Sequence, residues 1–213
     1  MRVNDIFYSL QGEGRHTGRA AVFVRFAGCN LRCAFCDTEF DSYREMTAEE
    51  VIAEISSYLP ASSTPGALPI IVLTGGEPTL QADEAFVDLL HQHGFKVAME
   101  SNGTRPAPKN LDWLTVSPKI AGERCVMTGN GKRPDELKVV FDENTEPEVF
   151  IPSSLALHSL SASPSEAPLL YLQPCDTGDA ERNKVITQAC VAYIKQHPQW
   201  RLSLQTHKLA DFK

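Results

Sequence analysis

The sequence contains no run of apolar residues long enough to cross a membrane, and its first residues, MRVNDIFYSLQGEG, lack the basic and apolar regions of a signal peptide. It also lacks an excess of basic residues, since 27 acidic side chains outnumber 20 basic ones and give a formal net charge of −7. A general nucleic-acid binder needs a basic face that neutralises phosphates. We therefore expect a cytoplasmic protein that has no membrane contact and does not bind nucleic acid directly.

The composition gives no sign of a second domain. At 213 residues, with 42% of them apolar, the chain is long enough to bury one substantial core. A single domain over residues 1–213 is therefore expected. Three of its six cysteines are isolated, Cys125, Cys175 and Cys190, and the other three are clustered. In a cytoplasmic chain this usage indicates metal or redox chemistry rather than a disulfide framework.

Segments typical of strands alternate with segments typical of helices. Strands are expected over residues 20–28, 69–78, 95–101, 112–118, 136–142, 168–174 and 200–206. Helices are expected over residues 47–59, 80–94 and 179–197, and Thr47 and Glu50 form a capping box for the first. The Pro- and Ser-rich segment 145–168 is expected to be a loop. Because strands outnumber helices, the sequence predicts an α/β fold, a shortened or partial βα barrel with fewer helices than strands.

Polar or glycine-rich clusters follow five of the expected strands. The cysteine cluster follows the first strand, TGGEP the second, ESNGT the third, SPK the fourth and QPCD the sixth. The carboxyl ends of parallel strands open on one side of a barrel, which is where ligands bind. The sequence therefore predicts that these five clusters form one site.

The cysteine cluster has three members within eight residues, Cys29, Cys33 and Cys36. A structural zinc site normally has four ligands, and a ferredoxin-type cluster is bound by four cysteines. Three thiolates can bind three irons of a 4Fe-4S cluster and leave the fourth iron open to another ligand. The alternative from the residues alone is a zinc site completed by a distant His or Cys.

The spacing CxxxCxxC, with Phe35 directly before the last cysteine and a GGEP segment downstream, resembles the radical S-adenosylmethionine superfamily. The resemblance implies that the open iron binds the amino and carboxylate groups of S-adenosylmethionine. One electron from the cluster would then split the sulfonium C–S bond and give a 5′-deoxyadenosyl radical.

Within that superfamily, the motifs LQGEG, CDT, TGGEP, VSPK, LQP and QTHK are similar to those of the 7-carboxy-7-deazaguanine synthases, over almost the whole chain. This resemblance implies conversion of 6-carboxy-5,6,7,8-tetrahydropterin to 7-carboxy-7-deazaguanine with loss of ammonia, in the biosynthesis of queuosine and other 7-deazapurines. It further implies a 4Fe-4S cluster, S-adenosylmethionine and Mg²⁺ as cofactors, an unidentified electron donor, and a homodimer.

The resemblance also implies roles for individual residues. The cluster ligands are Cys29, Cys33 and Cys36, with Phe35 beside the cluster, and the Mg²⁺ ligand is Thr38. The contacts to S-adenosylmethionine are Gly76, Ser117, Lys119, Gln173 and Asp176. The pterin contacts are Leu10, Gln11, Gly12, Arg25, Thr74 and the α-carboxylate of Lys213, whose side chain is expected to face solvent.

Physical chemistry supports some of these assignments and leaves simpler ones open. Two glycines in TGGEP would let the backbone approach a ligand closely, although a plain turn has the same composition. Arg25 would suit a carboxylate inside the barrel, and the simpler reading is a surface charge on an edge strand. For Thr38, the residue type alone favours a loop hydroxyl bonded to nearby backbone. Cys175 has no role in the pattern and is expected to be a small packed side chain.

Two other functions are compatible with the cysteine pattern. One is an activase that installs a glycyl radical on a protein partner; such enzymes often carry additional cysteine clusters, which this chain lacks. The other is a non-catalytic module that binds zinc or an iron-sulfur cluster. The module would show no turnover, so an anaerobic assay separates it from both enzymes.

Overall fold

The computed structural model describes residues 1–34, 36, 42–59, 68–120, 131–152 and 167–213. All nine strands of this part of the chain belong to one sheet, in the order β3-β1-β2-β4-β5-β6-β7-β8-β9. The strands are β1 Arg2–Leu10, β2 Ala20–Phe26, β3 Arg44–Glu45, β4 Ile70–Gly75, β5 Val97–Ser101, β6 Trp113–Val116, β7 Glu136–Phe141, β8 Leu169–Pro174 and β9 Trp200–Leu202. The sheet is parallel from β2 through β4 to β9, while β1 runs antiparallel to β2 and β3.

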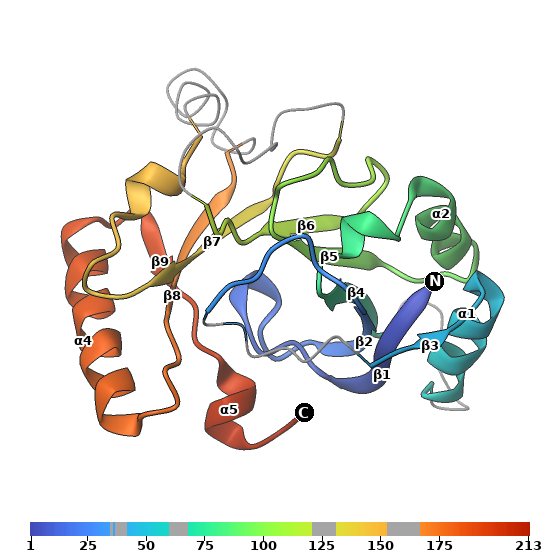
Figure 1. Cartoon of the computed structure of the whole chain (residues 1–213), viewed down its shortest axis with the longest axis horizontal. Coiled ribbons are helices and arrows are strands. Elements are labelled where there is room, and N and C mark those ends of the chain that lie inside the picture. The colour runs from blue at the N-terminus through green and yellow to red at the C-terminus, as the bar shows by residue number, and fades with distance from the viewer. Residues whose placement is uncertain (35, 37–41, 60–67, 121–130, 153–166) are drawn as a thin grey trace.

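The α-helices of the described residues are α1 Ala48–Ser57, α2 Glu84–Gln92, α4 Ala180–Gln196 and α5 Thr206–Ala210. Three short 3-10 helices are η1 Gly14–His16, η2 Pro78–Leu80 and η3 Pro147–Phe150. The helices α1, α2 and α4 lie on the outside of the curved sheet. The helix α5, near the C-terminus, lies between the two ends of the sheet (Figure 1). The prediction of a partial βα barrel with fewer helices than strands is confirmed. None of the helices in these residue ranges is both long and apolar enough to cross a membrane.

Most expected elements occur within a few residues of their predicted bounds. The capping box before α1 is present, because the Thr47 hydroxyl accepts from the Glu50 N–H and the Glu50 carboxylate accepts from the Thr47 N–H. The second helix begins later than expected, at Glu84, because the Asp83 carboxylate caps it by accepting from the Phe86 N–H. The expected loop 145–168 contains η3, and residues 153–166 lie outside the described part.

Two predictions about the ends of the chain were wrong. The strand β1 was missed because a register shift between Val3 and Asp5 interrupts the alternation of buried and exposed residues. The last strand was expected to run to Thr206 but ends at Leu202. The Ser203 N–H makes one more bond to the sheet, and the chain then turns into α5.

The two faces of the sheet are chemically different. Residues that alternate along β2, β4, β5 and β7 point outward into the main apolar core beneath the helices, for example Val24, Leu73, Met99 and Val139. The inward residues of the same strands include a small apolar group made of Ala21, Ile70, Val72 and Ala98. Further along these strands the inward residues are Arg25, Thr74, Glu100 and Lys138. The inner face therefore carries polar chemistry toward the carboxyl ends of the strands.

Candidate active site

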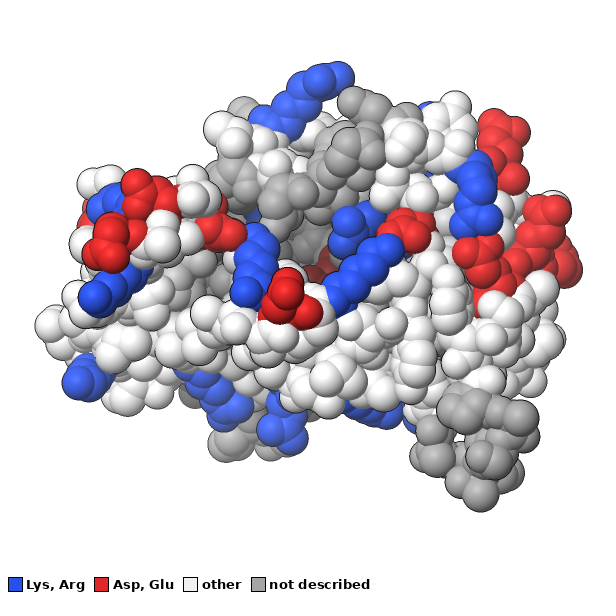
Figure 2. Space-filling model, turned by 90° about the horizontal axis from the view of Figure 1, so that it is seen from below, with Lys and Arg blue, Asp and Glu red and all other residues white. Residues whose placement is uncertain are grey.

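A pocket of about 590 Å³ lies against the inner face of the sheet. Its volume is within the range of small-molecule binding sites. In the space-filling view, a hollow opens on the face that carries α5, with basic and acidic side chains together at its rim (Figure 2). All predicted site residues that the structure describes line this one pocket: Leu10, Gln11, Gly12, Arg25, Cys29, Cys33, Cys36, Thr74, Gly76, Ser117, Lys119, Gln173, Asp176 and Lys213. The structure thus brings together residues that are spread over the whole chain.

Two predicted residues, Phe35 and Thr38, lie outside the described residues. Their expected roles beside the cluster and at Mg²⁺ therefore stay predictions. Among the described side chains, no group of three His, Cys, Asp or Glu residues is arranged to hold a metal ion.

The start of the cysteine loop is held by Glu77, whose backbone bonds to Gly28 and whose carboxylate is buried, at 0% exposed. Its Oε1 accepts from the Ser101 hydroxyl at 2.8 Å and from both the N–H and the hydroxyl of Thr79, at 3.1 and 2.6 Å. Its Oε2 accepts from the Asn102 N–H at 2.8 Å, and its own N–H donates to the Gly28 carbonyl at 2.9 Å. Glu77 therefore joins the carboxyl ends of β2, β4 and β5.

A second set of hydrogen bonds holds the cysteine loop against the end of β5. Asn102 Nδ2 donates to Asn30 Oδ1 at 3.0 Å and lies 3.9 Å from Cys29 Sγ. Asn30 in turn donates to the Thr104 hydroxyl at 2.8 Å. The Leu31 N–H donates to Cys29 Sγ at 3.4 Å. Hydrogen bonds to the sulfur of a metal ligand orient it and tune the bound group, so this end of the loop fits an iron-sulfur ligand.

The two glycines of TGGEP are also required by the packing of the protein itself. A Cβ atom on Gly76 would lie 1.9 Å from the Gly28 carbonyl oxygen, and one on Gly75 would lie 2.3 Å from the Phe26 oxygen. Gly75 also has a φ of +113°, which disfavours any other residue. The absent side chains therefore make room for the backbone at the end of β2 and at the start of the cysteine loop.

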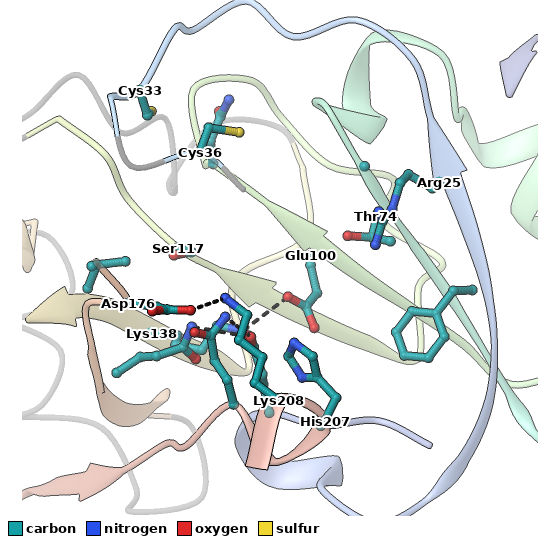
Figure 3. Close-up of a pocket in the computed structure, with 18 of the residues that line it drawn as sticks. Arg25, Cys33, Cys36, Thr74, Glu100, Ser117, Lys138, Asp176, His207 and Lys208 are labelled. Carbon is teal, nitrogen blue, oxygen red and sulfur yellow. Dashed lines mark hydrogen bonds and ion pairs between the residues drawn. The ribbon is translucent and has the colours of Figure 1, made fainter. Parts of the chain in front are cut away.

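The three thiols are close enough to influence one another electrostatically. Burial raises the pKa of Cys33, the neighbouring Cys36 and Cys29 raise it further, and the Lys119 ammonium opposes both effects. Figure 3 shows Cys33 and Cys36 on the side of the pocket opposite His207 and Lys208. A bound 4Fe-4S cluster would therefore face the pocket, with its three ligands supplied from one short loop.

Arg25 and two aromatic rings lie on another wall of the pocket. Because β2 pairs with β1 on one side and with β4 on the other, Arg25 does not lie on an edge strand. The Arg25 Nε atom is buried and has no hydrogen-bond partner in the described part of the chain. Its guanidinium carbon is 5.5 Å from the centre of the Phe7 ring, which stacks on Phe23 with centroids 4.9 Å apart. A buried guanidinium with an unused donor suits an anionic ligand.

The segment after β9 covers the opening between the two ends of the sheet (Figure 1). The N–H and hydroxyl of Thr206 both donate to the Gly12 carbonyl, at 3.0 and 2.9 Å. A Cβ atom on Gly12 would lie 2.4 Å from His207 Nδ1, so any larger residue would require the His207 side chain to move. The LQGEG and QTHK motifs, about two hundred residues apart in the sequence, are thus packed against each other.

Lys213 lies next to β1. Its main-chain oxygen accepts from the Ser9 hydroxyl, and its Nζ pairs with Asp5 at 2.7 Å. The ammonium also lies 4.6 Å from the centre of the Phe7 ring. The side chain is 64% exposed, as expected, although it makes these contacts with β1.

The side of the pocket near β6 and β8 carries polar residues in defined pairs. Lys119 Nζ donates to the Ser117 hydroxyl at 2.7 Å, and burial lowers the pKa of Lys119. Lys208 Nζ pairs with Asp176 Oδ2 at 2.7 Å (Figure 3). Hydrogen bonds from Lys208, the Gly178 N–H and Asn183 lower the pKa of Asp176 to about 2. Asp176 is therefore an anion at neutral pH.

Several lining residues were not predicted as site residues, most notably Glu13, Glu100, Lys138, His207 and Lys208. The structure places Lys138 between the Glu13 and Glu100 carboxylates. One signal was available in the sequence, because charged residues at alternate positions of the apolar strands VAMES and ELKVVF point to the inner face. Cys175 lines the pocket and also packs partly against the core, where burial raises the pKa of its thiol.

Known proteins resemble this chain along its whole length. The Radical SAM superfamily model matches residues 23–133. A 7-carboxy-7-deazaguanine synthase of Bacteroides thetaiotaomicron is 45% identical over 100% of this chain and 98% of its own length. The synthase of Nitratidesulfovibrio vulgaris is 43% identical over 97% of this chain and 96% of its own length. The crystal structure of QueE from Escherichia coli matches with a TM-score of 0.65 and 24% identity, over 95% of this chain and 92% of that one, which supports the fold. With the cysteine loop and the glycine turn in place at one pocket, the chain belongs to the 7-carboxy-7-deazaguanine synthase family of the radical S-adenosylmethionine superfamily.

Proposed function

We infer that this protein is a radical S-adenosylmethionine lyase that forms 7-carboxy-7-deazaguanine, a step in the biosynthesis of queuosine and other 7-deazapurines. The observation that carries this is the convergence of the cysteine loop, the TGGEP turn and Arg25 on one pocket. When bound, the cluster and S-adenosylmethionine supply a carbon radical that can abstract hydrogen from a substrate. We propose that the substrate is 6-carboxy-5,6,7,8-tetrahydropterin, that it loses ammonia, and that a single domain over residues 1–213 carries the reaction.

The chain's own residues have distinct proposed roles. Cys29, Cys33 and Cys36 would hold the cluster, and Phe35 would shield it from water. Contacts to S-adenosylmethionine are proposed for Gly76, Ser117, Lys119, Gln173 and Asp176. The charges of Asp176 and Lys119 suit the amino and carboxylate groups of a methionyl moiety.

The other side of the pocket would bind the pterin. Arg25 would bind the substrate carboxylate, because it lines the pocket and its buried Nε has no partner among the described residues. The other proposed contacts are Leu10, Gln11, Gly12, Thr74 and the α-carboxylate of Lys213.

We further propose that the enzyme uses Mg²⁺ and an electron donor and that it forms a homodimer. Thr38 would supply a hydroxyl ligand to Mg²⁺, whose other ligands would include the pterin carboxylate. The electron donor, the homodimer and a cytoplasmic location are implied by the family resemblance.

The direct test is anaerobic turnover. Protein reconstituted with iron and sulfide, reduced, and given S-adenosylmethionine, carboxypterin and Mg²⁺ should release 7-carboxy-7-deazaguanine and ammonia in equal amounts. Chromatography with mass detection measures the product. A protein that cleaves S-adenosylmethionine but leaves the carboxypterin unchanged would contradict the proposed substrate, and one that does neither would contradict the enzyme.

Replacing Cys29, Cys33 or Cys36 singly with Ala should abolish the cluster and the formation of 5′-deoxyadenosine, because each supplies one iron ligand. Iron and sulfide analysis with visible spectroscopy measures the cluster. The matched control is Cys190→Ala, because Cys190 lies on the buried face of α4, in the main core, and burial raises its pKa to about 12. A Cys33→Ala protein with a full cluster would contradict the assignment.

Arg25→Met should raise KM for the carboxypterin about ten- to a hundredfold, because a hydrogen bond to a charged group is lost. Cluster content and binding of S-adenosylmethionine should not change. The KM of Arg25→Lys should lie between those of the unmodified protein and Arg25→Met, since an ammonium cannot bind a carboxylate through two parallel donors. The control is Arg44→Met, which removes an exposed partner of Glu54 far from the pocket. If Arg25→Met leaves KM as it was, the carboxylate binds elsewhere.

Thr38→Ala should weaken the dependence of the rate on Mg²⁺, because one oxygen ligand is lost. Thr38→Ser, which keeps the hydroxyl, should behave like the unmodified protein. Titrating Mg²⁺ at saturating carboxypterin measures the half-saturating concentration for each protein. Identical titration curves for Thr38→Ala and Thr38→Ser would show that the hydroxyl is not a metal ligand.

A further inference from the structure

Lys138 lies at the centre of a buried charge network that no role given above explains. It is on the inner face of β7, and its side chain is only 4% exposed. Its Nζ pairs with Glu13, in the loop after β1, and lies 3.0 Å from Glu100 Oε2 on β5. One ammonium therefore joins three segments that are far apart in the sequence.

Each of the two carboxylates also accepts hydrogen bonds from glutamine side chains that line the pocket. Glu100 Oε1 accepts from Gln11 Nε2 at 2.8 Å. Glu13 Oε1 accepts from Gln173 Nε2 at 3.3 Å and from Gln205 Nε2 at 3.1 Å. The position of Gln11 and Gln173, which line the pocket, thus depends on two carboxylates that share one cation.

The charges around Lys138 show why the cation is needed. Burial alone would raise the pKa of Glu13, but the charge and hydrogen bond of Lys138, with smaller contributions from Gln205 and His207, together hold that pKa below its ordinary value. The carboxylates of Glu100 and Glu13 likewise overcome the effect of burial on Lys138 and raise its pKa. Without the ammonium, two buried carboxylates would lie close together with no cation between them.

Three other titratable groups face this network. Lys119 follows β6, and burial and the Lys138 charge lower its pKa. Glu136 lies two residues before Lys138 on β7, and burial raises its pKa to about 7. His207 on α5 contributes a smaller effect on Glu13. Glu136 accepts from the Arg15 N–H at 3.0 Å, a contact that does not involve Lys138.

We propose that Lys138 is a positioning residue: its ammonium holds Glu13 and Glu100 in place, and through them it aims the amides of Gln11 and Gln173 at the ligands of the pocket. The identity of those ligands rests on the proposed function. The positioning itself rests on the contacts of Lys138.

The first test is Lys138→Met, which keeps most of the side-chain volume and removes the charge. Since buried carboxylates without a cation repel each other, KM for the carboxypterin should rise about tenfold or more at neutral pH. Cluster content should not change. The repulsion falls when one carboxyl is protonated, so the rise in KM should shrink as the pH is lowered from about 8.5 to about 6.

The same change should appear in the apoprotein without any turnover. In Lys138→Met the ammonium that lowers the pKa of Glu13 is lost, so burial should raise that pKa in the folded state above its unfolded value. Such groups favour the folded state when protonated, and this contribution is lost as the pH rises. The deficit in Tm relative to the unmodified protein should therefore be larger at about pH 8.5 than at about pH 6.

The matched rescue is Lys138→Met combined with Glu13→Gln, which removes one negative charge together with the positive one. It should recover most of the KM and Tm that the single variant loses. Lys138→Arg keeps the charge and should lose less than Lys138→Met. The control is Lys96→Met, whose ammonium pairs with Asp112 at the surface and is 70% exposed. It should leave KM and its pH dependence unchanged.

The outcomes separate this proposal from the proposed function. If the unmodified holoenzyme makes no deazapurine, the proposed function fails. The Tm values of the Lys138 variants at the two pH values still test the proposed role of Lys138. If Lys138→Met lowers only kcat, with KM constant over the same pH range, Lys138 is merely structural. If neither Lys138→Met nor the double variant folds, a pair of uncompensated carboxylates is not the cause and the proposal is overturned.

Discussion

The arrangement of the whole site depends on one buried carboxylate, Glu77. Its four accepted hydrogen bonds come from the turn that follows it and from the end of β5, and its N–H reaches the loop after β2. A carboxylate that is removed from water is stable only with such a set of donors. The donors hold the carboxylate in place, and the carboxylate in turn holds the segments that carry those donors. The start of the cysteine loop, the glycine turn and the end of β5 are therefore held together by one side chain.

Much of the site was predictable because its residues occur at regular places in the sequence. Parallel strands put their carboxyl ends on one side, so clusters that follow successive strands must meet. The local spacing of Cys29, Cys33 and Cys36 and the capping box at Thr47 are also visible within a few residues. These features depend on short stretches of chain, and the structure agrees with them.

The features that were missed depend on partners far away in the sequence. Lys138 and Glu13 are 125 residues apart, so no local pattern shows that they pair. The strand β1 was missed because its register shift breaks the alternation on which strand prediction rests. The segment after Leu202 continues a strand-like pattern, but it leaves the sheet because Thr206 binds Gly12. The reason for Gly76 could not be predicted either, since it concerns the backbone of another loop.

The contact between the two ends of the chain sets an order for folding during synthesis. Ser9 and Lys213 are 204 residues apart, which at ordinary rates of translation corresponds to a delay of roughly 10 to 40 seconds. During that time the outer, apolar face of the sheet can already be covered by α1 and α2, which are close in sequence to the strands they cover. The inner face must wait for α5, and its charged and polar side chains tolerate water. The molecule thus leaves open longest the surface that is least prone to aggregate.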